Sequence, residues 1–186
     1  TVETVRIYAG LQPLPAEPPV LGYRLRALVD ELTLPPMVYR DGDFAVCSLL
    51  GEPEIVYFDP PLGPLPVHLA LHSEVATLPA SLRDKGVREV LFKTSGWGLA
   101  PEMLARVRAL IDFGFAGQEP VIAGETTVVP RDLLLSLLAR HLPPVACPSA
   151  TGPERVEDIV TEVRGARFDR PVTIRLATRT DREGLA

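Results

Sequence analysis

Apolar and polar residues alternate with a period of two along much of the chain, which is typical of β-strands with one buried face. Residues 2–9 alternate Val, Val and Ile with polar residues and end at Gly10. Asp41-Gly42 separates two short apolar runs and predicts a tight hairpin turn. The expected strands are residues 2–9, 37–39, 44–46, 55–58, 67–71, 87–92, 156–164 and 171–177, with a small hairpin within 121–129.

Other segments space their apolar residues for one face of a helix. The strongest pattern is at residues 101–113, where Pro101 opens the helix and Gly114 can end it in the left-handed conformation. Residues 130–141 follow, with Asp132 near the start, where it complements the helix dipole. Weaker helical patterns occur at residues 23–32 and 78–83. Because short turns join most of the strands, we expect an α+β fold with a mixed or antiparallel sheet and helices on one face.

One stretch, residues 64–79 (PLPVHLALHSEVATLP), interrupts an apolar run with a tight cluster of polar groups. These are His68, His72, Ser73, Glu74 and Thr77. On an unbroken strand, His68, His72 and Glu74 would share one face. The pattern therefore predicts a buried strand with a small polar site at its carboxyl end, where α/β-type proteins commonly bind ligands.

Two other interpretations of this stretch remain open. In the first, Ser73 and Glu74 cap a helical turn that begins at Pro79, and His72 is a core histidine. In the second, His68, His72 and Glu74 bind zinc through two imidazoles and a carboxylate, as in a metal-dependent hydrolase. The sequence contains no HExxH motif or comparable spacing, which weighs against the second interpretation.

Composition narrows the classes of function. The chain has 186 residues and a formal net charge of −5, and it contains no basic run with interleaved aromatic residues, so we do not expect nucleic-acid binding. No apolar stretch approaches the ~20 residues of a membrane span. Cys47 and Cys147 lie far apart without a CxxC partner, which predicts two free, buried thiols in a cytoplasmic protein.

A few further residues are candidates for binding. Arg24, beside Tyr23, could contact a carboxylate, because the guanidinium fork matches carboxylate geometry. Trp97 lies in a loop (TSGWG) and could cover a ligand, although the sequence favours packing on the core for both Tyr23 and Trp97. Arg131 follows Pro130 and could reach an anion at a helix N-terminus, but a surface charge beside Asp132 is the more frequent outcome. The sequence contains neither GxGxxG nor GxxxxGK[ST], so no nucleotide-binding fingerprint is present.

Several segments in order resemble the central domain of the saccharopine dehydrogenase family, which includes saccharopine reductases, lysine ε-dehydrogenases and carboxynorspermidine synthases. The segments are VRIYAGLQP (5–13), LGYRL (21–25), LHSEVATLP (71–79), VRALIDFGF (107–115), VVPRDLL (128–134) and VTEVRGARFDRPVTIRL (160–176). Together they extend over almost the whole chain.

The resemblance implies that residues 1–186 are one substrate-binding and dimerisation domain of the glyceraldehyde-3-phosphate-dehydrogenase C-terminal type. NAD or NADP would be bound by a Rossmann domain that is absent from this chain, which starts at Thr1 within an expected strand, and the chain alone would be inactive. The parent enzyme would transfer hydride at the C–N bond of an amino acid and form a homodimer. The candidate substrate-binding residues are Tyr23, Arg24, His72, Ser73, Glu74, Thr77 and Trp97. The alternative is a stand-alone oligomerisation or interaction domain without catalysis.

Overall fold

A computed structural model describes residues 1–11, 25–96, 99, 101–141 and 156–180. Its contacts divide the chain into two compact units. The first unit comprises Thr1–Gln12, Leu34–Ser95 and Arg155–Ala186, and the second comprises Pro13–Thr33 and Gly96–Glu154. The sequence predicted one domain over residues 1–186 and gave no sign of this division.

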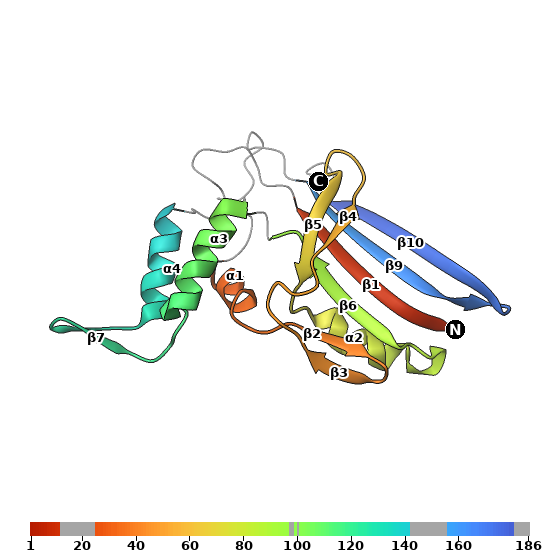
Figure 1. Cartoon of the computed structure of the whole chain (residues 1–186), viewed down its shortest axis with the longest axis horizontal. Coiled ribbons are helices and arrows are strands. Elements are labelled where there is room, and N and C mark those ends of the chain that lie inside the picture. The colour runs from red at the N-terminus through yellow and green to blue at the C-terminus, as the bar shows by residue number, and fades with distance from the viewer. Residues whose placement is uncertain (12–24, 97–98, 100, 142–155, 181–186) are drawn as a thin grey trace. The chain divides into compact units, whose positions relative to one another are not determined.

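The first unit is built on an eight-stranded sheet in the order β10-β9-β1-β6-β2-β3, with β5 also paired to β6 and β4 to β5 (Figure 1). Its strands are β1 (Val2–Leu11), β2 (Met37–Arg40), β3 (Asp43–Val46), β4 (Glu54–Tyr57), β5 (Pro64–Leu69), β6 (Glu89–Thr94), β9 (Glu157–Arg167) and β10 (Arg170–Thr180). β1 and β6 are parallel, whereas the other pairs are antiparallel. The predicted α+β class with a mixed sheet is therefore confirmed.

One helix of this unit, α2 (Ser73–Ser81), packs against β6 and β2 and buries Val75 and Pro79 (Figure 1). The sequence placed the start of this helix five residues later and expected Pro79 to open it, which is wrong. Pro79 lies inside the helix, where it removes only its own N–H from the backbone ladder. A short 3-10 helix, η1 (Arg83–Lys85), follows α2 in this unit. The other described helices belong to the second unit, so within the first unit the only described α-helix to which the prediction of helices on one face applies is α2.

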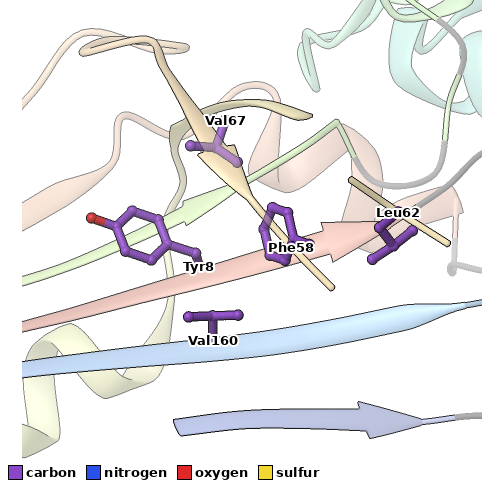
Figure 2. Packing of buried hydrophobic residues seen from close by; sticks show 5 residues of the cluster. All are labelled: Tyr8, Phe58, Leu62, Val67 and Val160. Carbon is purple, nitrogen blue, oxygen red and sulfur yellow. The ribbon is translucent and has the colours of Figure 1, made fainter. Parts of the chain in front are cut away.

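The sheet face that carries Tyr8 holds an apolar cluster under the β4–β5 hairpin. Tyr8, Phe58, Leu62, Val67 and Val160 form it, and each is at most 6% exposed (Figure 2). A Cβ on Gly10 would lie 2.7 Å from the Phe58 ring, so only glycine admits the ring this close to β1. Two arginines of β10 also bind the β4–β5 hairpin, through hydrogen bonds to its backbone carbonyls. Arg175 Nη2 donates to the Tyr57 carbonyl at 2.7 Å, and Arg179 Nη2 donates to the Asp59 carbonyl at 3.2 Å.

The second unit packs three helices, α1 (Leu25–Glu31), α3 (Pro101–Leu110) and α4 (Pro130–His141), around fully buried Leu28, Val29, Val107 and Leu134. After α3 the chain makes one wide turn, Ile111–Phe115, in which Gly114 is left-handed at φ 98°, as predicted. The hairpin β7 (Val121–Ala123) and β8 (Thr126–Val128) leads into α4, which also confirms the sequence prediction. The described helices are too short or too polar to cross a membrane.

Candidate functional site

The polar cluster predicted at residues 68–77 lies where β5 ends and α2 begins. Leu69 is the last residue of β5, and the strand does not continue to Glu74 as the sequence suggested. His72 is instead the residue before the first turn of α2, in an extended conformation with φ −147° and ψ 148°. Ser73 and Glu74 therefore occupy the start of a helix, where a carboxylate is favourable to the helix dipole.

His72 is fixed on two sides. Its ring stacks on Phe92 of β6 with the centroids 3.9 Å apart and the planes 7° from parallel. Its Nδ1 contacts the Glu74 carboxylate at Oε2, and Ser73 Oγ donates to the same oxygen at 3.1 Å. No described residue hydrogen-bonds the second ring nitrogen, Nε2. Because the His72 side chain is 38% exposed, Nε2 is the nitrogen available to a ligand.

The Glu74 carboxyl group is acidic for a glutamate. Partial burial raises its pKa, but hydrogen bonds from its own backbone amide, His72 and Ser73 more than offset this, so the pKa is lowered. The carboxylate is thus ionised at neutral pH and can accept a hydrogen bond from Nδ1 of His72. The Glu74 carboxylate brings a negative charge to the site, which suits a cationic group of a ligand better than an anionic one.

Two other residues of the predicted cluster do not join this site. Thr77 Oγ1 donates to the Ser73 carbonyl at 3.2 Å, a bond within the helix. His68 Nδ1 bonds the Leu50 carbonyl at 3.2 Å. The described residues contain no group of three or more His, Cys, Asp or Glu side chains that could hold a metal ion, so the zinc interpretation of His68, His72 and Glu74 has no support in this arrangement. Tyr23, Arg24 and Trp97 lie outside the described residues.

The opposite face of the sheet carries a charge network that the sequence analysis missed. Lys93 follows Phe92 on β6 and therefore points to the other face. It is 5% exposed, and its Nζ donates to the Glu54 carboxylate at 2.5 Å and to the Glu52 carbonyl at 2.8 Å. A lysine that ends the apolar run VLFK is unusual for a buried strand and was the available signal.

Arginines extend this network across the neighbouring strands. Arg40 forms a two-pronged pair with Glu52, at 2.7 Å for each bond, and Arg6 Nε lies 2.7 Å from the Glu89 carboxylate. Burial raises the pKa of Tyr8, and the charge of Glu54 adds to this effect although Arg6 opposes it. Since each of these cations is paired with a glutamate, the network is suited to hold strands together and not to capture an anion.

The second unit contains a separate polar cavity of about 400 Å³, lined by Arg26, Asp30, Gln118, Val129, Arg131 and Asp132. Arg131, which the sequence offered as an anion ligand or a surface charge, is 7% exposed and forms an ion pair with Asp30. The backbone N–H groups of Arg131 and Asp132 donate to the carbonyls of Gly117 and Val129. The start of α4 is thus satisfied internally and does not offer its amides to an anion.

No protein-family model matches the chain. Among solved structures, the chain is similar to an apo, histidine-tagged saccharopine dehydrogenase (L-Glu forming) from Saccharomyces cerevisiae, with a TM-score of 0.53 and 14% sequence identity. The match covers 96% of this chain and 53% of the yeast chain, so this chain spans about half the length of that enzyme. At this identity the likeness establishes a similar fold.

Proposed function

We propose that this chain is the substrate-binding and dimerisation domain of an NAD(P)-dependent oxidoreductase of the saccharopine dehydrogenase type, which acts on the C–N bond of an amino acid. One observation carries the proposal: the fold likeness to a saccharopine dehydrogenase extends over 96% of the chain. The sequence segments that resemble the same family lie along the same length of chain, in order.

The residues of this chain do not fit the nicotinamide cofactor themselves. The sequence has no glycine-rich phosphate loop, and the connection from β5 to α2 places the Glu74 carboxylate in the first helical turn. A carboxylate there opposes the phosphates that dinucleotide-binding helices accept at their N-termini. In this proposal the cofactor is therefore bound by a Rossmann domain outside this sequence, and this chain orients the amino acid.

His72 is the residue that we assign to the substrate. In this proposal the Nδ1–H of His72 donates to the Glu74 carboxylate, and Nε2 accepts an N–H of the substrate's amino group. Phe92 supports the ring from behind, and Ser73 fixes the carboxylate. Fixing both groups before binding lowers the entropy lost when the substrate is ordered.

A titration with amino acids, followed by NMR of the histidine ring, tests this assignment. L-Lysine, L-glutamate and saccharopine should be added in turn, and the right ligand should move the His72 ring signals. His72→Gln should weaken its binding at least tenfold, whereas Thr77→Val, which alters only a bond within α2, should leave binding unchanged. A ligand that binds His72→Gln as tightly as the wild type contradicts the assignment.

A second candidate is a stand-alone oligomerisation domain without catalysis. The observation that favours it is an exposed apolar row at one end of the sheet, where Ile159, Ile174 and Leu176 are 40%, 50% and 59% exposed. Self-association without any amino-acid binding supports this candidate over the first.

A further inference from the structure

β10 is a long strand at the edge of the described sheet. This strand stands at one end of the sheet order and pairs with β9 along all of its residues from Arg170 to Thr180. Within the described part of the chain, no strand pairs with its other side. A long edge strand of this kind presents a row of backbone N–H and C=O groups to any chain that can pair with it.

The hairpin turn determines which backbone groups face outward. Phe168 and Asp169 are both left-handed, at φ 51° and 59°, and Arg167 and Arg170 are register partners beside them. A two-residue turn of this type places the backbone groups of Arg170 toward β9, and the direction alternates thereafter. The outward set is therefore Pro171, Thr173, Arg175, Ala177 and Arg179. Pro171 has no N–H, and proline is tolerated in a sheet where the N–H would face away from the ladder.

The side chains of β10 point alternately to the two faces of the sheet. Val172, Ile174 and Leu176 lie on one face, and Ile174 and Leu176 are 50% and 59% exposed. Arg175 and Arg179 lie on the other face, where they hold the β4–β5 hairpin. The edge thus offers a short apolar row beside the outward backbone groups of Thr173 and Arg175.

We propose that β10 is the self-association edge of this protein, and that two copies pair antiparallel along β10 across a two-fold axis at Ile174. A two-fold axis perpendicular to the sheet keeps the same face of both copies on the same side. Residues that oppose each other across the axis must then have their side chains on the same face, which requires that the axis pass beside one residue and its own copy. With Ile174 on the axis, Ile174 meets itself, and Val172 opposes Leu176 of the second copy. Thr173 and Arg175 of the two copies then exchange backbone hydrogen bonds on both sides of the axis.

The charges and the apolar side chains of β10 favour pairing with a second copy in this register. An axis at Arg175 would place two guanidinium groups directly opposite each other, which is unfavourable, whereas the Ile174 axis places Arg175 opposite Thr173. An axis at Leu176 would place Ile174 opposite Thr178 and lose apolar contact. Ile174 also sits at a non-hydrogen-bonded position of the new ladder, where facing Cα atoms approach to about 4.5 Å.

This inference deepens the proposed dimerisation role and rests on it. Amino-acid binding at His72 does not depend on it, because His72 belongs to the β5–α2 connection and not to the hairpin. Failure of the β10 pairing would therefore leave the amino-acid titration unaffected, and the two parts of the account can fail separately.

Sedimentation velocity over a range of concentrations, with edge variants, tests the pairing. Thr173→Pro removes one outward N–H while it leaves the ladder with β9 and the apolar row intact. We expect a wild-type dimer, at least tenfold weaker association for Thr173→Pro, and no change for the control Thr173→Ala. A wild-type protein that stays monomeric, or a Thr173→Pro dimer as tight as the wild type, overturns the proposal; the latter result points to packing through the sheet face.

Cross-linking gives a second measurement that does not require a disruptive variant. In a Cys47→Ser, Cys147→Ser background, Ile174→Cys places one thiol on the axis at a separation that suits a disulfide. Val172→Cys is the matched control, because Val172 opposes Leu176 and not itself. Oxidation should give covalent dimers for Ile174→Cys only. Equal cross-linking of both variants, or none through position 174, overturns the register and the proposal.

Discussion

A histidine whose Nδ1 is fixed by a carboxylate presents a single, oriented nitrogen to a ligand. His72 has this arrangement because Glu74 lies two residues later, in the first turn of α2, and Phe92 lies against the ring. The sequence brought His72, Ser73 and Glu74 together because they are adjacent in the chain. It could not assign their roles, since it placed them on a strand where Ser73 would face away from the other two.

The acidity of Glu74 predicts a pH dependence of stability. Hydrogen bonds hold its pKa below the ordinary glutamate value of about 4.3, so its contribution is present above that value and is lost as the pH falls through the lowered pKa. Glu74→Gln should therefore be less stable than the wild type at pH 7, by less than about 1 kcal/mol because the pair is partly exposed. Urea unfolding at pH 7 and at about pH 3 measures the difference, which should shrink at the lower pH. A difference that grows on acidification contradicts this prediction.

The Lys93–Glu54 pair should respond unequally to loss of either partner. The Lys93 side chain is 6% exposed and that of Glu54 is 38% exposed. Glu54→Met leaves a buried ammonium without its closest carboxylate and should lower the free energy of unfolding by about 3 kcal/mol. Lys93→Met leaves a carboxylate that water can reach, and it should cost less than about 1 kcal/mol. Chemical denaturation of both variants is the measurement, and equal costs would contradict the account of burial.

The sequence did not reveal this network because its partners are distant in the chain. Lys93 and Glu54 are 39 residues apart, and Arg6 and Glu89 are 83 apart. Local periodicity locates strands but does not determine which strands become neighbours. An ion pair between a glutamate and a buried lysine or arginine can be recognised only when the order of the strands in the sheet is known.

At the scale of elements, local signals were sufficient where turn chemistry decided the outcome. Asp41-Gly42 adopts the left-handed turn that the sequence indicated, with φ 49° and 96°, and α4 extends over Pro130–His141 as predicted. The error at α2 had a physical origin. The sequence predicts Pro79 at the start of a helix, because proline is favoured there, but the six residues before it already belong to α2.

The β9–β10 hairpin depends on an ion pair that should be testable at this scale. Arg179 contacts the Asp158 carboxylate through two bonds of 2.7 Å, and the Asp158 side chain is 3% exposed. Arg179→Met leaves that carboxylate buried without its guanidinium and should cost about 3 kcal/mol of unfolding free energy.

Arg164→Met is the matched control on the neighbouring strand. Its pair with Glu162 is more accessible, since the Arg164 side chain is 51% exposed, and its loss should cost less than about 1 kcal/mol. Thermal and urea unfolding of the two variants compares them directly. If both changes cost the same, burial of Asp158 does not explain the stability of the hairpin.

At the scale of the whole molecule, the fold class followed from the sequence and the topology did not. Alternating apolar residues joined by short turns predicted an α+β fold with a mixed sheet, which the structure has. The parallel pairing of β1 with β6 and the division into two units depend on contacts between distant segments. The resemblance of short segments to the saccharopine dehydrogenase family agrees with the fold likeness over 96% of the chain.

The most direct test of the central claim is a calorimetric titration of NADPH and NADH into two forms of the protein. One form is this chain, and the other extends it by the coding sequence that adjoins it in its gene. The account predicts that the chain alone binds neither cofactor and that the extended form binds one of them. Cofactor binding by the chain alone, or by neither form, would contradict the assignment of this chain as the substrate domain of an NAD(P)-dependent dehydrogenase.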